Sequence, residues 1–373
     1  MTVRAVCVRP PTPGASLEQV PAPTLTPDAV LVDVLECGVC GTDRDIVDGK
    51  YGAAPVGAPY LVLGHENLGV VRSVGREVSG FAPGDLVVAT VRRGCGKDRF
   101  CRANKSDECE TGEFTERGIG GAHGFMAEQY VEIPQYLVRV PPALRSVAVL
   151  LEPLTVVEKA AFMGQRVLDR RGATPGEPIT STPSALVAGT GAVGMLAAFL
   201  LRVRGYDVTA IDRHGDETPA AALLRRVGAT HASVADGVGS LAGRTFDLVI
   251  EATGSVSLDF GLVDLLRRNG VLVLTGIPDA NEPPTSIAAG ALLRNVVLRN
   301  QAVIGSVNAN RSYFEAGLRD MTVVEERWPG ALAAMITARR PLDEFLAVIS
   351  GRTPGSMKTV LTVAPGGAAA QPM

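Results

Sequence analysis

Residues 184–213 read SALVAGTGAVGMLAAFLLRVRGYDVTAIDR, and this stretch decides the fold of the segment around it. A short apolar strand leads into the turn Gly189-x-Gly-x-x-Gly194, a helix is expected over Met195–Arg204, and a second strand leads to Asp212. Glycines in such a turn permit a tight bend, the close approach of a pyrophosphate, and close packing of the helix on the strand. The N-terminus of the helix then faces the phosphates. The stretch therefore predicts a dinucleotide-binding unit.

The alternation of apolar strands and amphipathic helices continues to about residue 305. It includes an expected helix over Leu258–Asn269 and an expected strand over Gly270–Thr275. Such a run predicts a parallel sheet covered by helices on both faces, with dinucleotides binding at the carboxyl ends of the strands. The predicted cofactor contacts along this segment are Gly189, Thr190, Gly191, Ala192, Val193, Gly194, Asp212, Arg213, Thr253, Gly254, Thr275 and Ile277.

Asp212 and Arg213 bear on the choice of cofactor. A carboxylate at the end of the second strand can accept hydrogen bonds from both adenosine-ribose hydroxyls of NAD, and it repels the 2′-phosphate of NADP. Arg213 can bind that phosphate, so the two neighbours favour different cofactors. We expect NAD to be preferred, with NADP as an alternative.

Residues 36–69 carry a second set of reactive side chains. Cys40 lies in Cys-Gly-Thr-Asp, and the pair His65-Glu66 follows a loop rich in glycine and proline. Thiolate, imidazole and carboxylate are ligand types that zinc accepts, and a catalytic zinc keeps one position open. A Cys and a His at this spacing are more often a buried thiol and a core histidine. The flanking glycines and the downstream dinucleotide signature favour a catalytic zinc here.

Two neighbouring residues have competing interpretations. Cys37 forms a Cys-x-x-Cys with Cys40, which is typical of a redox pair, but the Gly-Thr-Asp after Cys40 favours metal for Cys40 and packing for Cys37. Glu152 stands amid apolar residues just before Pro153, after which we expect a helix. An unpaired carboxylate there would be costly, so a metal ion is its expected partner.

Several motifs carry a family resemblance. GVCGTD at 38–43 and GHENLGVV at 64–71 resemble the zinc-site motifs of the medium-chain dehydrogenases. Over about residues 1–360 the chain is similar to the glucose 1-dehydrogenase family best known from archaea. This second resemblance rests on GFMAEQY at 124–130, LLEPLTVVEKA at 150–160 and IGSVNANRSYF at 304–314.

The resemblance implies an α/β fold class. We expect a Rossmann domain with a doubly wound parallel sheet at 184–308 and a β-rich, GroES-like catalytic domain at 1–183, which includes a lobe loop over 92–110. Residues 309–373 are expected to return to the catalytic domain, with a disordered tail over 364–373.

The resemblance also implies roles at the zinc. Cys40 and His65 hold the metal, with Glu66 and Glu152 as carboxylate ligands, either directly or through water. In the broader superfamily the acid at the position of Glu66 often only orients a neighbouring ligand. Thr42 relays the proton of the substrate hydroxyl, unless its own hydroxyl simply bonds the nearby backbone.

Further roles concern the sugar. Glu116 is expected to contact sugar hydroxyls and Asn308 to contact the nicotinamide or the sugar. Alternatively, Glu116 is only a solvated loop acid and Asn308 is only a polar residue in a turn. His123, on a glycine-flanked loop, either binds substrate or closes a lid, or is only solvated. The expected substrate contacts are Thr42, Glu116, Glu152 and Asn308.

The lobe departs from its relatives. Residues 92–110, RRGCGKDRFCRANKSDECE, match a segment that is commonly Cys-x2-Cys-x2-Cys-x7-Cys, a structural zinc knuckle. Here the four positions are Cys95, Asp98, Cys101 and Cys109. Three thiolates and one carboxylate can close a tetrahedron around zinc. Equally, the missing cysteine can leave an empty lobe held by its own packing. The spacing of the three cysteines leans toward zinc.

The overall composition limits other functions. With 36 basic and 39 acidic residues the net charge is −3, so the sequence indicates no nucleic-acid or membrane-surface binding. The apolar run over 185–203 is about long enough to cross a bilayer, but the three glycines of the turn lie in it. No basic and apolar leader opens the chain, so a cytoplasmic protein is expected. The resemblance suggests a homo-oligomer, a dimer or a tetramer.

The combined expectation is an oxidoreductase. It oxidises C1 of a cyclic aldose, above all D-glucose, to the lactone and passes a hydride to C4 of the nicotinamide. Zinc stabilises the developing alkoxide in this reaction. The alternatives are another sugar, a polyol, a cyclitol or an alcohol as substrate, and a nucleotide-binding relative that has lost catalysis.

Overall fold

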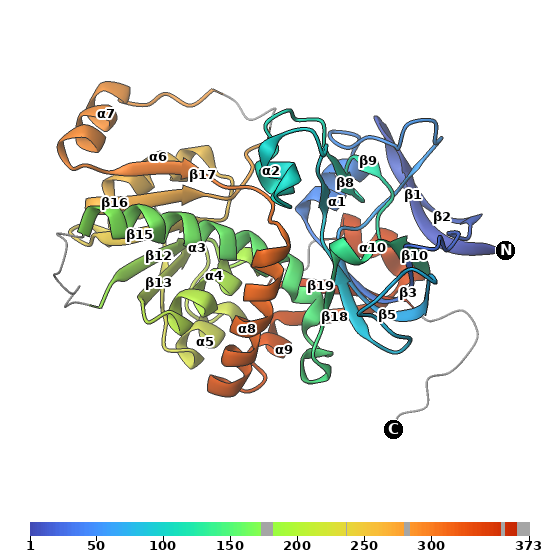
Figure 1. Ribbon diagram of the computed structural model, residues 1–373. Coiled ribbons are helices and arrows are strands. Elements are labelled where there is room, and N and C mark those ends of the chain that lie inside the picture. Colours follow the sequence, from blue (N-terminus) through green and yellow to red (C-terminus); the bar gives the residue numbers. More distant parts are fainter. Residues whose placement is uncertain (173–181, 236, 280–283, 352–354, 364–373) are drawn as a thin grey trace. The chain divides into compact units, whose positions relative to one another are not determined.

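The computed structural model describes residues 1–172, 182–235, 237–279, 284–351 and 355–363. The predicted disordered tail over 364–373 lies outside this described part. The chain divides into two compact units, and Figure 1 shows the elements of both. The first unit comprises Met1–Glu152, Asn308–Met321 and Ile336–Met373, and the second comprises Pro153–Val307 and Thr322–Met335.

The second unit is built on a six-stranded parallel sheet with the order β14-β13-β12-β15-β16-β17. The strands are β12 Ser184–Ala188, β13 Asp207–Asp212, β14 Thr230–Ser233, β15 Phe246–Glu251, β16 Leu266–Leu274 and β17 Ala302–Gly305. The helices between them are α4 Ala192–Val203, α5 Pro219–Arg226, α6 Val256–Asp264 and α7 Ala289–Leu298. The strand order reverses between β12 and β15, which is the switch point of a doubly wound sheet. The predicted fold class is confirmed.

Apolar runs explain why these strands form the centre of the unit. Leu186, Ile211 and Val249 come from three neighbouring strands and are fully buried in one cluster. The apolar run over 185–203 is therefore a core strand followed by a core helix. Among the described residues, no helix combines the length and apolar character that crossing a membrane requires.

Two predicted element boundaries are wrong. Helix α6 ends at Asp264 and β16 already begins at Leu266, because Leu266 pairs with Phe246 across an irregular first step of the ladder. The buried leucines before Asn269 fit a helix or a strand equally well, so their pattern did not locate the change. Helix α3, Leu151–Gly172, begins before Pro153. A proline is tolerated in the first turn because its missing N–H has no helical partner there.

The first unit is rich in strands. A seven-stranded sheet has the order β11-β6-β5-β3-β19-β18, with β10 also paired to β3, and a three-stranded sheet has the order β2-β1-β4. These strands are β1 Thr2–Arg9, β2 Thr12–Pro21, β3 Val30–Val39, β4 Leu61–Val62, β5 Glu66–Val74, β6 Leu86–Ala89, β10 Gln129–Glu132, β11 Leu137–Arg139, β18 Ile336–Pro341 and β19 Lys358–Thr362.

A small sheet of β7 Arg92–Arg93, β8 Thr115–Arg117 and β9 Gly121–Ala122 flanks the lobe. The remaining helices are α1 Gly41–Val47, α2 Arg99–Arg102, α8 Arg311–Arg327, α9 Ala331–Met335 and α10 Phe345–Ser350.

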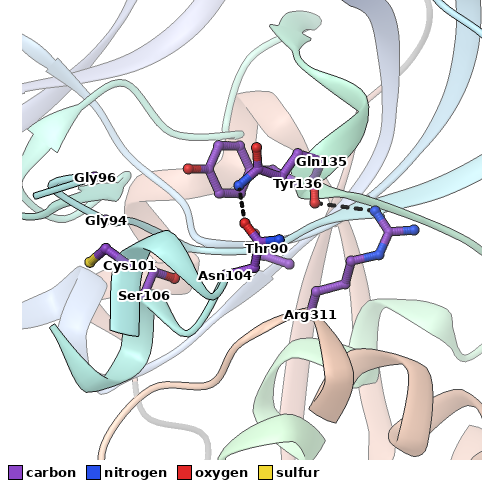
Figure 2. A pocket seen from close by; sticks show the side chains of 9 residues that line it. All are labelled: Thr90, Gly94, Gly96, Cys101, Asn104, Ser106, Gln135, Tyr136 and Arg311. Atoms are coloured by element: carbon purple, nitrogen blue, oxygen red, sulfur yellow. Dashed lines mark hydrogen bonds between the residues drawn. The ribbon is translucent and has the colours of Figure 1, made fainter. Parts of the chain in front are cut away.

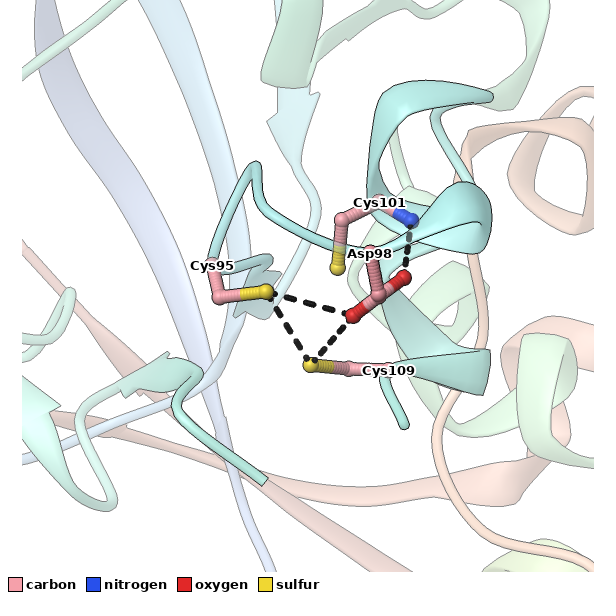
Figure 3. A group of neighbouring side chains, drawn as sticks. All are labelled: Cys95, Asp98, Cys101 and Cys109. Atoms are coloured by element: carbon pink, nitrogen blue, oxygen red, sulfur yellow. Dashed lines mark hydrogen bonds between the residues drawn. The ribbon is translucent and has the colours of Figure 1, made fainter. Parts of the chain in front are cut away.

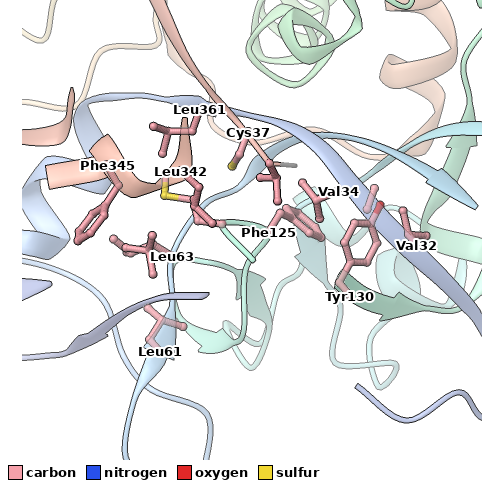
Figure 4. Packing of buried hydrophobic residues seen from close by; sticks show 14 of the residues in the cluster. Val32, Val34, Cys37, Leu61, Leu63, Phe125, Tyr130, Leu342, Phe345 and Leu361 are labelled. Atoms are coloured by element: carbon pink, nitrogen blue, oxygen red, sulfur yellow. The ribbon is translucent and has the colours of Figure 1, made fainter. Parts of the chain in front are cut away.

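The core of the first unit gathers side chains from distant parts of the chain (Figure 4). Phe125 and Tyr130 meet edge to face with ring centroids 4.7 Å apart. Leu361 of β19 joins them from the far end of the sequence. Cys37 is fully buried in this cluster, and burial raises the pKa of its thiol well above its ordinary value. A buried, protonated thiol is a packing residue rather than half of a redox pair.

Candidate metal centre and cofactor site

Cys40 and His65 are brought together by two paired strands of the first unit. Strand β3 leads into Cys40 and β5 starts directly after His65, and Gly38 of β3 lies opposite Glu66 of β5. Cys40 Sγ and His65 Nε2 are 3.1 Å apart. The pairing of two neighbouring strands thus closes the sequence gap between the predicted ligands.

Cys40 also caps the N-terminus of α1. Its Sγ accepts a hydrogen bond from the Thr42 N–H at 3.2 Å, and the Asp43 carboxylate accepts one from the Cys40 N–H at 2.9 Å. The sequence Cys-Gly-Thr-Asp therefore forms a reciprocal cap. The thiolate is the form of this sulfur that would bind a metal.

Asp43 has a second role behind His65. Its Oδ1 lies 3.5 Å from His65 Nδ1, and its side chain is fully buried. Burial alone lowers the pKa of His65, but the charges of Cys40 and Asp43 outweigh it and raise that pKa well above its ordinary value. A carboxylate on Nδ1 orients the ring so that Nε2 faces Cys40. Our reading of the sequence missed Asp43, although it stands in the quoted motif.

Glu66 forms a buried ion pair with Lys358. The Lys358 ammonium lies 2.6 and 2.5 Å from the two carboxylate oxygens, and both side chains are 2% exposed. Burial lowers the pKa of Lys358, but the neighbouring charges, chiefly Glu66 and then Cys40, outweigh this and raise it. Lys358 is 292 positions away from Glu66, and no local motif marks it.

The donor atoms of this cluster suit one metal ion. The ligand atoms of Cys40, His65 and Glu66 all lie within 4.8 Å of one another, and the set of thiolate, imidazole and carboxylate is one that zinc binds. Glu152 is buried at the start of α3 and is not a member of this 4.8 Å group. Burial is the main cause that raises the pKa of Glu152 to about 7, against the opposing effect of His65. A nearby cation would lower that pKa and stabilise the carboxylate.

The lobe forms a second cluster (Figure 3). Asp98 Oδ2 lies 3.2 Å from the sulfurs of both Cys95 and Cys109, which are 3.7 Å apart. With Cys101, the four ligand atoms lie within 4.8 Å of one another. The other oxygen, Asp98 Oδ1, accepts the N–H groups of Phe100 and Cys101 at the start of α2. Asp98 is thus fixed by its own cap while Oδ2 faces the thiols, an arrangement that fits a tetrahedral zinc.

The surroundings of the lobe shift the pKa values of its donors in different directions. The hydrogen bond from the Cys101 N–H holds the pKa of Asp98 well below its usual range. Burial is the main cause that raises the pKa of Cys101 to about 12, while the hydrogen bond with Thr111 lowers that of Cys109. A Cβ on Gly94 would lie 2.5 Å from the Cys101 sulfur, so this position requires glycine.

A pocket of about 490 Å³ adjoins the lobe (Figure 2). It is lined by Cys101, Tyr136 and Arg311, among others. None of the predicted catalytic residues lines it. Its rim is held by hydrogen bonds from Gln135 Nε2 to Asn104 Oδ1 at 2.8 Å and from Arg311 Nη1 to the Pro134 carbonyl at 2.9 Å. The pocket is therefore part of the framework of the lobe.

Glu116 and Asn308 are directly bonded. Asn308 Nδ2 donates to Glu116 Oε1 at 2.7 Å, and the Arg92 guanidinium donates to the same oxygen from Nε at 3.1 Å and from Nη2 at 3.0 Å. Glu116 is 8% exposed, so it is not a solvated loop acid. Asn308 has φ of 57°, a left-handed conformation that asparagine tolerates. Arg92 is a further member of this set that the sequence did not identify.

His123 packs within the first unit. Its Nδ1 accepts the Val62 N–H at 3.2 Å and its ring stacks on Tyr60 with centroids 5.1 Å apart. Burial, and to a lesser extent the charge of Arg117, lowers the pKa of His123. These contacts describe a neutral ring that holds β4 in place.

The cofactor turn of the second unit has the shape that the glycine pattern predicts. Gly189 has φ of 102°, and a Cβ on Gly194 would lie 1.9 Å from the Gly189 carbonyl oxygen. A Cβ on Gly191 meets nothing within 4 Å, so its backbone is open to an approaching pyrophosphate. Ala192 and Val193 begin α4 directly after it. Asp212, at the end of β13, accepts hydrogen bonds from the Thr190 hydroxyl and the His214 N–H.

A buried acid organises the two Thr-Gly turns. Glu251 ends β15 and is fully buried. It accepts the Thr253 hydroxyl at 2.6 Å, the Gly254 N–H at 2.8 Å and the Gly276 N–H at 3.1 Å. Thr275 donates its hydroxyl to the Glu251 carbonyl, while Ile277 is exposed beyond the turn. Glu251 was missed because its role depends on a neighbouring strand.

These features define a class of protein. A chain that combines a doubly wound sheet, this glycine turn and a Cys-His-Glu cluster belongs to the zinc-dependent medium-chain dehydrogenases. Zinc and NAD(P) are the cofactors of this class. Residues 145–363 match the family model described as "Glucose dehydrogenase C-terminus", and residues 26–142 match the "Alcohol dehydrogenase GroES-like domain". The chain therefore belongs to the glucose dehydrogenase family.

Individual relatives agree with this assignment. The chain is 40% identical to the glucose 1-dehydrogenase of Thermoproteus tenax, over 92% of this chain and 94% of the relative. It is 39% identical to that of Methanocella arvoryzae, over 94% and 93%. Among solved structures, the glucose dehydrogenase of Haloferax mediterranei in complex with NADP, Zn and gluconolactone has a TM-score of 0.85 at 30% identity, over 97% of this chain and 99% of that one.

Proposed function

We propose that this protein oxidises C1 of a cyclic aldose, most of all D-glucose, to the lactone, with hydride transfer to the nicotinamide of NAD(P). The observation that carries the proposal is the meeting of Cys40, His65 and Glu66 within 4.8 Å, in a chain of the glucose dehydrogenase family. The relatives at 39% and 40% identity bear the name glucose 1-dehydrogenase, which supports this substrate.

Zinc at this centre would be held by Cys40 and His65, with Glu66 and Glu152 as carboxylate ligands directly or through water. A bound zinc supplies the positive charge that stabilises the alkoxide forming at C1. Both oxygens of Glu66 lie against Lys358. This geometry favours the alternative in which Glu66 does not bind zinc directly but orients a neighbouring ligand.

The residues of the chain carry the proton and orient the metal ligands. Thr42, whose N–H is fixed on the Cys40 sulfur, is the proposed relay for the hydroxyl proton of the substrate. Asp43 holds the ring of His65 from behind, which keeps Nε2 directed at Cys40. The ammonium of Lys358 pairs with the carboxylate of Glu66 and so offsets one of the buried negative charges of the cluster.

We assign sugar binding to Glu116 and Asn308. Their bond and the two bonds from Arg92 all end on Glu116 Oε1, so we infer that Oε2 receives a sugar hydroxyl. A carboxylate already held by a guanidinium is oriented before the substrate arrives, which lowers the entropic cost of binding.

For the cofactor we propose NAD as the preferred substrate, with NADP also used. Asp212 is placed to accept the ribose hydroxyls, and the neighbouring Arg213 is the group that can take a 2′-phosphate. The pyrophosphate would lie on the turn formed by Gly189, Gly191 and Gly194, with Thr253 and Thr275 at the next two strand ends.

The lobe is proposed to hold a second, structural zinc. Cys95, Asp98, Cys101 and Cys109 supply four donors, and the arrangement of Asp98 supports a carboxylate in place of the usual fourth thiolate. The predicted boundaries at residues 183 and 308, and the cytoplasmic location, remain part of this proposal.

A homo-oligomer is proposed from the second unit. Helix α7 exposes Leu293, Val297 and Leu298 at 60%, 73% and 57%, and the edge strand β17 exposes Val303 at 43%. A helix with exposed apolar side chains, and a strand that stands last in the described sheet, are surfaces that a second copy of the chain can cover. A dimer and a tetramer are both compatible with it.

The deciding experiment follows the formation of reduced nicotinamide by the purified protein with D-glucose, with NAD and NADP offered separately. Glucose-dependent turnover that is lost on removal of zinc by a chelator and recovered on adding zinc supports the proposal. Turnover with a polyol, a cyclitol or another sugar but not with glucose would refute glucose as the substrate, and the proposed zinc-dependent dehydrogenation would stand. Cofactor binding without any turnover would refute the proposal that this protein is an active dehydrogenase.

A further inference from the structure

His231 lies beside the acid that is proposed to select the cofactor. It belongs to β14, where it stands opposite Ala210 of β13, two positions before Asp212. The side chain is 1% exposed. Its Nε2 is 3.3 Å from Asp212 Oδ1, and its Nδ1 is 2.6 Å from Asp216 Oδ1. A buried ring therefore bridges two carboxylates at the carboxyl edge of the sheet.

The two carboxylates determine how the ring of His231 can bond. An ionised carboxylate only accepts hydrogen bonds, so a ring nitrogen of His231 that bonds one of them does so as the donor. The hydrogen bond from His231 is the main cause that lowers the pKa of Asp216, and the charge of Arg225 on α5 acts in the same direction. Arg225 also donates to the Asp216 carbonyl at 3.2 Å.

The bridge also fixes the orientation of Asp212. Oδ2 accepts the hydroxyl of Thr190, which lies in the glycine turn, so this oxygen faces the cofactor side. Oδ1 accepts the His214 N–H and lies 3.3 Å from His231 Nε2. Contacts on both oxygens hold the carboxylate plane, and the contact from His231 is the one that comes from the neighbouring strand.

We propose that His231 is a positioning residue that determines cofactor specificity: it holds Asp212 in the orientation that accepts the adenosine ribose of NAD and faces the 2′-phosphate of NADP. This inference rests on the proposed role of Asp212. If the ring only completed the packing of β14, its replacement would lower stability and leave the preference between the two cofactors unchanged.

The test compares kcat and KM for NAD and for NADP in the full-length, zinc-loaded protein. His231→Leu removes the donor from Asp212, and a hydrogen bond to a charged group is worth enough to raise the KM for NAD about tenfold. We expect kcat to change less than about twofold, because the ring does not touch the reacting atoms, and the NAD to NADP preference to fall by about tenfold. His231→Gln keeps an N–H donor and should recover most of the loss.

A double-mutant cycle separates this inference from its foundation. In an Asp212→Ala background, His231→Leu should have no further effect on the preference, because there is no carboxylate left to orient. If Asp212→Ala shifts the preference toward NADP while His231→Leu leaves it unchanged, the inference is overturned and the role of Asp212 stands. If Asp212→Ala itself has no effect, the role of Asp212 fails and the inference fails with it.

Two further variants guard the result. His214→Gln is a matched control, because the exposed ring of His214 takes no part in the bridge and its N–H bond to Asp212 is a backbone contact. Its cofactor preference should match the wild type. If His231→Leu does not fold, Asp216→Asn weakens the bridge from its exposed end, where the side chain is 68% exposed. It should move the preference in the same direction by about two- to threefold, and an unchanged preference would count against the inference.

Discussion

Replacing Lys358 by methionine is the most direct test of the buried ion pair at the metal centre. The ammonium lies 2.6 Å from Glu66 Oε1, and both side chains are 2% exposed. At that distance and an effective dielectric constant of about 20, two unit charges attract by about 6 kcal/mol. Desolvation offsets part of this attraction, but Lys358→Met leaves Glu66 buried without its partner. We expect the free energy of unfolding to fall by about 3–5 kcal/mol.

The assay is urea unfolding of the zinc-free protein, followed by circular dichroism. The matched control is Lys50→Met, since Lys50 lies 3.5 Å from Asp45 and is 43% exposed, and an exposed pair is worth at most about 1 kcal/mol. The double variant Glu66→Gln with Lys358→Met removes both charges and should regain most of the lost stability. A loss below about 1 kcal/mol in Lys358→Met, or a double variant less stable than the single one, would refute the reasoning.

Three other predictions concern separate parts of the site. The wild-type protein should contain about two zinc ions per chain by elemental analysis, and Asp98→Ala should contain about one. About one zinc ion per chain in the wild type would refute the proposed zinc site in the lobe. Glu116→Gln should raise the KM for glucose about tenfold or more with the KM for NAD unchanged, because a charged hydrogen bond to the sugar is lost, and an equal rise in both KM values would point to a general distortion. His123 should make stability pH-dependent: its pKa in the folded chain is below the ordinary value of 6.5, so the unfolded chain binds the proton more readily and stability falls as the pH drops below about 6.5. His123→Gln should flatten that part of the stability curve, and an unchanged curve would contradict the assignment.

The sequence predicted most of what is local. The turn from Gly189 to Gly194 was predictable because the tight bend and the close packing of the helix on the strand are set within a few residues. The structure shows both, in the positive φ of Gly189 and in the lack of room for a Cβ at Gly194. The doubly wound sheet followed from the alternation of elements. The position of the change from α6 to β16 did not, because a run of buried leucines satisfies helix and strand alike until the partner strand is known.

The unpredicted residues share a physical cause. Lys358 reaches Glu66 only because β19 pairs with β3, so that Thr359 faces Val39 beside the metal centre. Arg92 reaches Glu116 through the pairing of β7 with β8. In both cases the sheet register, which a single sequence does not reveal, decides which charge meets which.

The same logic explains where specificity can reside in this fold. The metal ligands and the glycine turn are set by short motifs, and their chemistry is common to the class. The partners that hold Glu66, Glu116 and Asp212 in place come instead from neighbouring strands, as Lys358, Arg92 and His231 do. The orientation of each acid therefore depends on a partner that lies outside the acid's own motif. We therefore expect substrate and cofactor preference to respond to substitutions at Arg92 and His231, and the common zinc chemistry to respond to Cys40, His65 and Lys358.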